Sequence, residues 1–464
     1  MQAPERIDVT PATARTVGYE LCAAARFEEA LPLFRAAFET EPSSQAAQGV
    51  GLCMTELGQN EEALSWFDRA IVILRDEMIA LSSNRGKALG ELGRTDEALA
   101  MFNNILRSCP NHALSYYNRG LMLMQQGAHR AAILDFDQAL KREPQNAKAL
   151  FGRGFANLVL GNYAEGFRDY EYRLKDLIDE PDAPVWTGEQ SLKGKTILIH
   201  GEQGHGDDIM FMRYVPAMLA LGATVYAVLH PGVAPLFKNA VGVTLLTEDR
   251  TTWPKFDYWV RMMSLAWCLG TTSATVPPPA ILTFDKAEWQ SWRDRIAALT
   301  KPDTTLRVGL CWSGSPKSRY DAHRSVPLAE LAPLLSIRGA QFFSLQLGVR
   351  DGDAEIFQKF CAYDHTVDLS SGLKDFSDTA HAIAQLDLVI TCDTSVAHLA
   401  GTVGVPTWIM LTAFRTYWLW IEKRTTSPWY PSARLFRQER DGDWAGVVEK
   451  IRDNLVNVIA APAA

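Results

Sequence analysis

The sequence has no long apolar run and no apolar segment at its start. Its most apolar later stretch, residues 215–229, is interrupted by Gly222 and Thr224 and is too short to cross a bilayer. The first residues include Glu5, Arg6 and Asp8 where a secretory signal would have its apolar core. These two absences predict a cytoplasmic protein without a membrane span.

Closely spaced metal-binding residues and excess positive charge are lacking too. The seven cysteines are odd in number and form no C-x-x-C pair, and the nine histidines lack zinc-ligand spacing. We therefore expect reduced thiols in a cytoplasmic protein, with no metal or other cofactor. The formal net charge of -8 argues against a nucleic-acid partner, although it allows a local basic cleft for a small phosphate ligand.

The first 175 residues contain an internal repeat. A glycine recurs at intervals of 33, 35, 34 and 34 residues, at Gly18, Gly51, Gly86, Gly120 and Gly154. An aromatic residue recurs at the same intervals, at Phe34, Phe67, Phe102, Phe136 and Tyr170. Small residues let two helices approach closely, an aromatic ring fills the gap, and stacked units bury a common core. The pattern resembles the tetratricopeptide repeat, and five units cover residues 11–177.

The repeat pattern places several polar and aromatic residues on the first helix of each unit. The resemblance implies that these helices line a concave face that binds a peptide or a protein. The candidate contacts to an acceptor protein are Asn84, Tyr117, Asn118 and Asn157. The alternative is that several of them are packed or solvated residues. The fifth unit departs from the pattern at Gly166 and Tyr170, as a terminal repeat packed on another domain would.

The periodicity changes after residues 179–195, which are rich in proline, aspartate and glycine and are interpreted as a linker. Short apolar runs then alternate with helical stretches, which predicts parallel sheets with helices on both faces. The predicted strands are 196–200, 224–230, 257–262, 307–312, 341–346, 387–392 and 407–411. We expect a repeat array at 1–178 and two Rossmann-like lobes, 196–303 and 304–464, that face a cleft. The last helix is expected to pack back on the first lobe.

A glycine-rich segment, residues 199–209, is the first candidate site. A predicted strand ends at His200, and a helix begins at about Asp207. Glycines and free N–H groups at a helix start suit a phosphate, but two successive carboxylates would repel it. A carboxylate held in the cleft as a general base is one interpretation, and a helix cap is the other. The segment comprises the cleft-loop residues Gly204, His205, Gly206, Asp207 and Asp208.

The second candidate site, residues 387–401, follows a predicted buried strand. The strand leads to Asp393, Thr394 and Ser395 at the start of a helix, with His398 one turn later. Hydroxyls, free amides and the positive end of a helix suit a phosphate or diphosphate. The alternative is an ordinary capped helix with a histidine that faces the core.

The third candidate site, residues 311–327, combines a serine–glycine loop with cations in an otherwise acidic chain. Ser313 follows a predicted strand, and Lys317, Arg319 and Arg324 come after it. A cation here could neutralise a leaving phosphate, and a solvated basic loop is the alternative. The Asp-Gly-Asp runs at 351–353 and 441–443 are interpreted as turns rather than metal sites.

Taken together, these segments resemble the heptosyltransferase-like family 9 glycosyltransferases of GT-B fold, in the bacterial branch that carries tetratricopeptide repeats. The resemblance extends from residue 186 to about residue 456. The matching segments are Gly-Glu-Gln-Gly-His-Gly-Asp (201–207), Val-Gly-Leu-Cys-Trp-Ser-Gly (308–314), Arg-Ser-Val-Pro-Leu (324–328), Phe-Ser-Leu-Gln (343–346), Asp-Thr-Ser-Val-Ala-His-Leu-Ala-Gly (393–401), Ser-Pro-Trp-Tyr-Pro-Ser (427–432) and Arg-Leu-Phe-Arg-Gln (434–438).

The resemblance implies a role for each candidate residue. Asp207 corresponds to the family's catalytic base, and Arg324 corresponds to its phosphate-binding cation, which is usually a lysine. Gln346 falls where the family contacts the nucleoside. The remaining donor-binding candidates are Ser313, Asp393, Thr394, Ser395 and His398. Repeat-bearing relatives tend to have Asp-Trp-Arg-Trp-Leu where this chain has Tyr-Trp-Leu-Trp-Ile at 417–421, so the resemblance does not define the donor sugar.

The expected function is inverting, metal-independent transfer of a sugar from a nucleotide-sugar donor to an acceptor hydroxyl. The repeats imply that the acceptor is a serine or threonine of a protein, such as a flagellin-like protein. One alternative is an enzyme that acts on lipopolysaccharide or another glycan. The other is a non-catalytic scaffold whose second half only binds a nucleotide.

Overall fold

The computed structural model describes residues 10–73, 78–174, 180–316, 321–362, 366–413 and 416–460. The chain forms two compact units, Met1–Ala156 and Asn157–Ala464. The fold class agrees with the sequence prediction, because a helical repeat array precedes an α/β region with two parallel sheets. No helix within the described ranges is long and apolar enough to cross a membrane.

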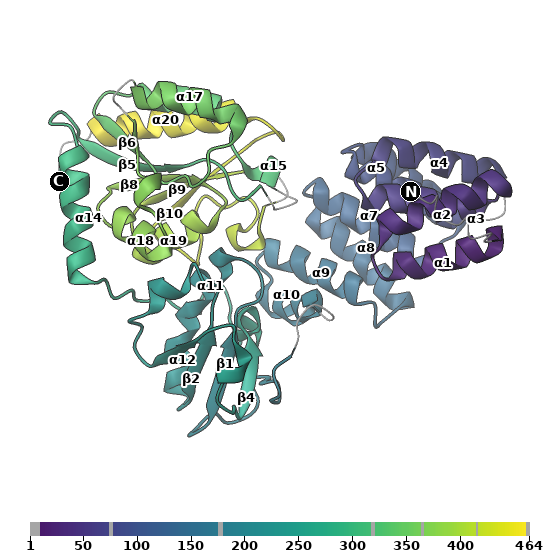
Figure 1. The fold of residues 1–464 in the computed structure, drawn as a ribbon, viewed down its shortest axis with the longest axis horizontal. Helices are drawn as coiled ribbons and strands as arrows, with labels where there is room; N and C mark the ends of the chain where they lie inside the picture. The colour runs from purple at the N-terminus through teal and green to yellow at the C-terminus, as the bar shows by residue number, and fades with distance from the viewer. Residues whose placement is uncertain are drawn as a thin grey trace, which may run out of the picture. The chain divides into compact units, whose positions relative to one another are not determined.

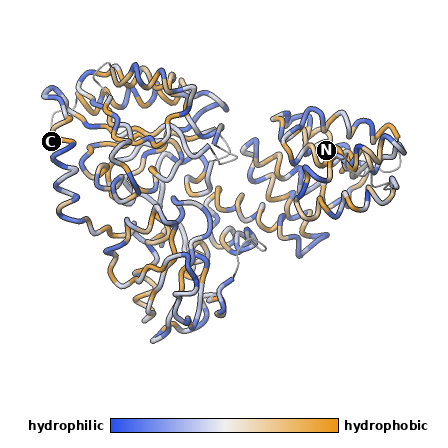
Figure 2. The backbone as a smooth tube through the Cα atoms, viewed as in Figure 1, coloured by the Kyte–Doolittle hydropathy of each residue, from blue (hydrophilic) through white to orange (hydrophobic). Residues whose placement is uncertain are grey.

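The first unit is built from antiparallel helix pairs (Figure 1). Its helices are α1 (Pro11–Ala23), α2 (Phe27–Thr40), α3 (Ser44–Glu56), α4 (Asn60–Ile73), α5 (Met78–Glu91), α6 (Thr95–Ser108), α7 (Ala113–Gln125) and α8 (His129–Arg142), followed by α9 (Ala147–Val159), which crosses into the second unit. Polar and apolar residues alternate along these helices, as expected for helices that bury one face (Figure 2).

In the first four units, the repeated glycines and aromatics contact each other as predicted. A Cβ added to Gly18 would lie 2.7 Å from the ring of Phe34, and one added to Gly51 would lie 2.5 Å from the ring of Phe67. Only glycine therefore allows the ring to pack against the facing helix. The glycine between the helices of four pairs has a positive φ, and in the first pair Ala25 adopts this conformation with φ 56°.

The second unit begins with the end of α9 and with α10 (Tyr163–Tyr170), which continues into the 3-10 turn η2 (Glu171–Leu174). A four-stranded parallel sheet follows in the order β3-β2-β1-β4. Its strands are β1 (Thr196–His200), β2 (Thr224–Val228), β3 (Val243–Leu246) and β4 (Tyr258–Arg261). The helices of this lobe are α11 (His205–Phe211), α12 (Val215–Ala220) and α13 (Leu265–Cys268).

The second lobe contains a six-stranded parallel sheet in the order β10-β9-β8-β5-β6-β7. Its strands are β5 (Leu306–Cys311), β6 (Ala340–Ser344), β7 (Thr366–Asp368), β8 (Leu388–Cys392), β9 (Thr407–Leu411) and β10 (Ala433–Arg437). Its helices are α15 (Asp321–Arg324), α16 (Ala332–Leu335), α17 (Asp351–Ala362), α18 (Phe376–Ile383), α19 (Ser395–Val403) and α20 (Trp444–Ala460). Figure 1 shows α17 and α20 on one face of this sheet and α18 and α19 on the other.

Two helices pack differently from the expected division into lobes. The last helix, α20, was expected on the first lobe, but its apolar face joins the core of the second lobe through Trp444, Val447 and Ile451. The helix α14 (Lys286–Leu299) falls in the range expected for the first lobe. It packs against α18 of the second lobe, where the Trp292 Nε1–H donates to Asp378 Oδ1 at 3.3 Å.

Candidate active site

The glycine-rich loop holds Asp207 in the first turn of α11. The loop follows β1, and α11 begins at His205. The backbone N–H of Gly204 donates to Asp207 Oδ2 at 2.9 Å, and the Asp207 N–H donates back to the Gly204 carbonyl at 2.9 Å. These two hydrogen bonds fix the carboxylate at the start of the helix. The Oδ2 atom of Asp207 therefore has a capping role, which was one of the two interpretations of this residue.

The other carboxylate oxygen of Asp207 accepts a hydrogen bond from Tyr417. The phenol O–H lies 2.8 Å from Asp207 Oδ1. Burial raises the pKa of Asp207 from its ordinary value of 3.8 to about 6, and the negative charges of Asp208 and Glu202 add to the rise. The hydrogen bonds from Gly204 and Tyr417 oppose it. Asp207 is therefore a carboxylate that titrates close to neutral pH, as a general base requires.

The neighbouring carboxylate, Asp208, anchors the loop to the first sheet. Its Oδ2 accepts the backbone N–H of His230 at 2.7 Å and lies 2.8 Å from His230 Nδ1. The side chain of Asp208 is fully buried, and its hydrogen bond raises the pKa of His230. His205 lies beside this pair, with its ring tilted and its centroid 4.9 Å from that of His230. These contacts assign Asp208 a structural position, whereas Asp207 faces the second lobe.

The second candidate segment lies directly against the first. Helix α11 packs on α19, and a Cβ added to Gly206 would lie 2.6 Å from His398 Cδ2. Tyr417 joins the segments as well, because its backbone N–H lies 3.4 Å from Asp393 Oδ2. Two segments almost 200 residues apart in the sequence therefore form one site, because each follows the carboxyl end of a parallel strand.

The second segment provides the N-terminus of a helix and an uncharged imidazole. Thr394 caps α19, and Ser395 is its first residue. Burial lowers the pKa of His398 to about 3, and the positive charges of Arg213 and Arg324 lower it further. His398 is therefore uncharged near neutral pH, with its Nδ1 3.2 Å from the Tyr430 hydroxyl. Burial also raises the pKa of Asp393.

In the third candidate segment, the predicted cation Arg324 shares a carboxylate with Arg350, which the sequence interpretation did not include. Arg324 Nε donates to Asp321 Oδ1 at 3.3 Å, and Arg350 Nη2 donates to Asp321 Oδ2. Both arginines share one buried carboxylate, so this cluster carries a net positive charge beside the loop after β5. Gly314 lies under it, because an added Cβ would come within 2.6 Å of Arg324 Nη2. Two further predicted cations, at positions 317 and 319, lie outside the described residues.

The two other predicted donor contacts, Gln346 and Ser313, differ in whether the protein satisfies their side chains. Gln346 is buried, and its Oε1 accepts the backbone N–H groups of Trp312 at 3.2 Å and Ser313 at 3.0 Å. Its amide thus secures the loop after β5. The Ser313 hydroxyl is buried and has no hydrogen-bond partner among the described residues.

The predicted contacts on the repeat helices do not form one exposed surface. Asn118 is buried and donates to the Ser83 hydroxyl at 3.0 Å. Asn157 is also buried, and its Oδ1 accepts from Asn162 Nδ2 at 3.1 Å. Asn84 is half-buried, and the ring of Tyr117 packs 6.1 Å from that of Phe136. For Asn118 and Asn157, these contacts agree with the packed alternative.

A cavity of about 230 Å³ opens at the carboxyl ends of β1 and β2. It is lined by His200, Gly201, Val228, Leu229, His230, Glu248, Arg250 and Trp253. The cavity adjoins the loop that carries Asp207, and its lining combines an indole ring with charged and imidazole side chains. It therefore offers space for a polar group on the first lobe, beside the imidazole of His230.

Comparisons with known proteins agree with the repeat interpretation. Models of the tetratricopeptide repeat match residues 18–77, 84–112 and 113–146. The chain is 29% identical over 300 residues to Protein FlbA of Caulobacter vibrioides, and the match covers 60% of this chain and 48% of FlbA. The chain thus spans about half of the length of that relative.

Two solved structures resemble different parts of the chain. A thermophilic tetratricopeptide-repeat protein of Thermus thermophilus is 22% identical, with 36% of this chain and 94% of that chain covered and a TM-score of 0.34. A family 9 glycosyl transferase of Veillonella parvula is 12% identical, with 59% of this chain and 99% of that chain covered and a TM-score of 0.44. The family models thus find tetratricopeptide repeats in the first part of the chain, as the sequence pattern predicted.

Proposed function

We propose that the chain is a glycosyltransferase that moves a sugar from a nucleotide-sugar donor to an acceptor hydroxyl. The observation that supports this most directly is the position of Asp207. Its carboxylate, with a pKa of about 6, lies where the glycine-rich loop of the first lobe meets α19 of the second. The site thus combines a base that is ionised at neutral pH with a helix start suited to a phosphate.

The proposed reaction is a direct displacement that inverts the anomeric carbon. Asp207 removes the proton from the acceptor hydroxyl as its oxygen attacks this carbon. The new bond joins the acceptor oxygen to the sugar, and the bond from the sugar to the donor phosphate breaks. The leaving phosphate keeps the electron pair of that bond, and the proton stays on Asp207.

Charge stabilisation of the leaving phosphate comes from the second lobe. The N-terminus of α19 provides backbone N–H groups and the hydroxyls of Thr394 and Ser395. Arg324 adds positive charge, since Asp321 neutralises only one of the two arginines that it contacts. In this proposal, these fixed groups take the role that a divalent ion has in other transferases. His398 takes part as a neutral hydrogen-bonding group.

The proposed acceptor is a serine or threonine of a protein, such as a flagellin-like protein modified in the cytoplasm. The repeats support this part of the proposal, because stacked helical pairs commonly form protein-binding surfaces. The cavity at the carboxyl ends of β1 and β2 supports an acceptor position on the first lobe.

A donor screen with the full chain tests the transferase proposal. Hydrolysis and transfer are measured for UDP-, GDP-, ADP- and CMP-sugars, with the candidate acceptor protein and with a glycan acceptor. We expect one donor to be used and the activity to fall at least about a hundredfold in Asp207→Asn. Asp441→Asn, which changes an exposed residue in the turn before α20, is the matched control and should retain activity.

Three outcomes would contradict parts of the proposal. Nucleotide binding without turnover of any donor would favour a non-catalytic scaffold. Transfer to the glycan alone would overturn the protein acceptor. Full activity in Asp207→Asn would show that Asp207 is not the base.

A further inference from the structure

The end of the repeat region belongs to the same compact unit as the candidate site. Helix α10 and the turn η2 form one continuous segment, Tyr163–Leu174, which we call the α10–η2 segment. The sequence pattern describes this segment as the second helix of the fifth repeat. In the structure it contacts both lobes close to Asp207.

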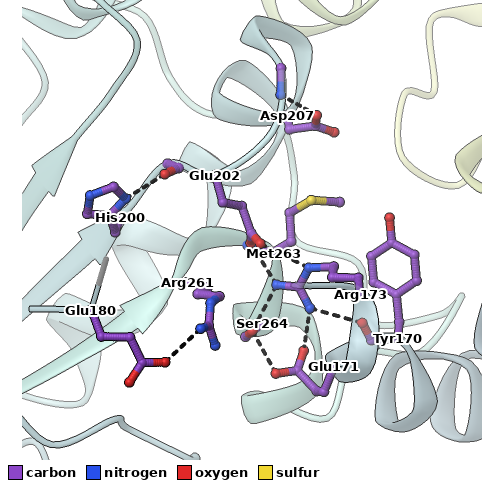
Figure 3. A network of polar contacts seen from close by, with 12 residues as sticks. Tyr170, Glu171, Arg173, Glu180, His200, Glu202, Asp207, Arg261, Met263 and Ser264 are labelled. Atoms are coloured by element: carbon purple, nitrogen blue, oxygen red, sulfur yellow. Dashed lines mark hydrogen bonds and ion pairs between the residues drawn. The ribbon is translucent and has the colours of Figure 1, made fainter. Parts of the chain in front are cut away.

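Its contact with the first lobe is a buried ion pair. Arg173 donates through Nε and Nη2 to both carboxylate oxygens of Glu202, at 3.0 and 2.7 Å. The side chains are 1% and 0% exposed. The remaining N–H groups of Arg173 reach Glu171, Ser264 and the carbonyl of Tyr170, so all five of its donors have acceptors (Figure 3).

Glu202 connects this ion pair to the loop that carries Asp207. It lies five residues before Asp207, and its Oε1 also accepts the backbone N–H of Met263 at 2.8 Å. The loop after β1 is therefore tied to the end of β4 and to Arg173 through one carboxylate (Figure 3). A buried carboxylate that loses its cation becomes an uncompensated charge, so the loop depends on this pair.

The contact with the second lobe is aromatic. Phe167 and Tyr170 pack on Trp418, with ring centroids 5.4 and 6.2 Å apart from it. Trp418 is fully buried and directly follows Tyr417, the residue that donates to Asp207 Oδ1. The hydroxyl of Tyr163 also accepts a hydrogen bond from Trp429 Nε1 at 2.7 Å.

We propose that the α10–η2 segment positions Asp207 from both lobes, with Arg173 as the positioning residue for the glycine-rich loop. Arg173 acts through Glu202 on the loop, and the aromatic contacts act through Trp418 on Tyr417. The catalytic meaning of this positioning rests on the proposed function. The positioning itself is a property of the structure that can be measured without a donor.

The experiment compares the full-length protein with Arg173→Met by hydrogen–deuterium exchange and by thermal unfolding. We expect exchange of the backbone amides at 201–208 to rise roughly tenfold in the variant. Exchange in the repeats at 18–112 should not change. The matched control is Arg261→Met, which removes the more exposed ion pair of Arg261 with Glu180, 2.8 Å apart in the same lobe (Figure 3).

A second variant keeps the test decisive if the methionine variant does not fold. Arg173→Lys retains the positive charge but cannot make the two parallel hydrogen bonds to Glu202, so we expect a smaller rise in exchange at 201–208. Unchanged exchange at 201–208 in a folded variant at Arg173 would overturn the proposal. An equal rise in Arg261→Met would also overturn it, because the effect would then not be specific to Arg173.

Activity separates this proposal from the proposed function. Once a donor is identified, kcat should fall roughly tenfold in Arg173→Lys while the KM for the donor stays the same, since the base is displaced but the donor contacts remain. A looser loop in a protein that turns over no donor would support the positioning and contradict the transferase. Wild-type transfer that needs Asp207 but is unaffected by Arg173→Lys would support the transferase and contradict the positioning.

Discussion

Replacing Asp207 by asparagine should stabilise the protein at neutral pH while removing the proposed activity. Asparagine has the shape of a protonated aspartate and cannot ionise. It can still accept the N–H of Gly204, which bonds to Oδ2 in the wild type. The change therefore isolates the free energy of placing a negative charge at this position.

The pKa of Asp207 sets the magnitude of this effect. Burial raises it from 3.8 to about 6. At about 1.4 kcal/mol for each unit of pKa, an ionised Asp207 lowers the free energy of unfolding by up to about 3 kcal/mol. The folded state holds the proton more tightly than the unfolded state, so the wild type loses this stability as the pH rises from about 4 through about 6. The asparagine variant has no such loss.

The assay is equilibrium unfolding in guanidinium chloride, followed by the fluorescence of the buried tryptophans of the second unit, at several pH values. We expect Asp207→Asn to exceed the wild type by about 2–3 kcal/mol at pH 7.5 and to equal it near pH 4. Asp441→Asn controls for the loss of one negative charge at an exposed position. A variant no more stable than the wild type at pH 7.5 would refute the argument that burial raises this pKa.

Two further substitutions test the contacts around the candidate base. Tyr417→Phe removes a hydrogen bond that lowers the pKa of Asp207. In this background, the stability difference between the proteins with Asp207 and with Asp207→Asn should therefore develop at a higher pH than it does with Tyr417 present. An unchanged pH dependence of this difference would mean that the phenol does not contact the carboxylate in solution. Gly206→Ala places a Cβ 2.6 Å from His398 and should lower the free energy of unfolding by about 1–3 kcal/mol, as measured by chemical unfolding. Gly352→Ala has no heavy atom within 4 Å of its added Cβ and should show no such loss.

The repeat and seven of the ten strands in the described residues follow from the sequence, because each depends on local patterns. The glycine and aromatic positions recur at a fixed period, and their contacts repeat from unit to unit. The apolar runs that predicted strands correspond to β1, β2, β4, β5, β6, β8 and β9. Some of the predicted strands were too long, and two of these included Trp312 and Gln346, which lie just beyond β5 and β6. Both residues are buried, so burial alone does not show where the strand pairing ends.

The three strands absent from the prediction lie at sheet edges. β3, β7 and β10 each pair with a single neighbour, so their residues need not be uniformly apolar. β3 is mostly half-exposed, β7 has only three residues, and β10 contains two arginines in five residues. None of these has the continuous apolar run that distinguishes a buried parallel strand.

The candidate site was predictable in its segments but not in its side-chain contacts. Asp207 and Asp393 each follow the carboxyl end of a parallel strand, and the expected cleft between the two lobes placed them near each other. The partners of these carboxylates come from positions that no period or motif relates to them. Tyr417 lies 210 residues from Asp207, and Arg173 lies 29 residues before Glu202 in a different element. Only the folded arrangement shows that the end of the repeats and the 417–421 segment contact the candidate base.

The departure of this chain at Tyr417 bears on how Asp207 titrates. An aspartate side chain is much shorter than that of tyrosine, so an aspartate at position 417 would not reach Asp207 Oδ1 as the phenol does. A phenol instead donates a hydrogen bond and remains neutral, since burial and the charge of Asp207 raise the pKa of Tyr417 well above its ordinary range. Asp207 therefore titrates as a single acid with a pKa of about 6 and is available as a base at neutral pH. The tyrosine in this chain is thus compatible with the proposed base, because it gives Asp207 a neutral hydrogen-bond donor.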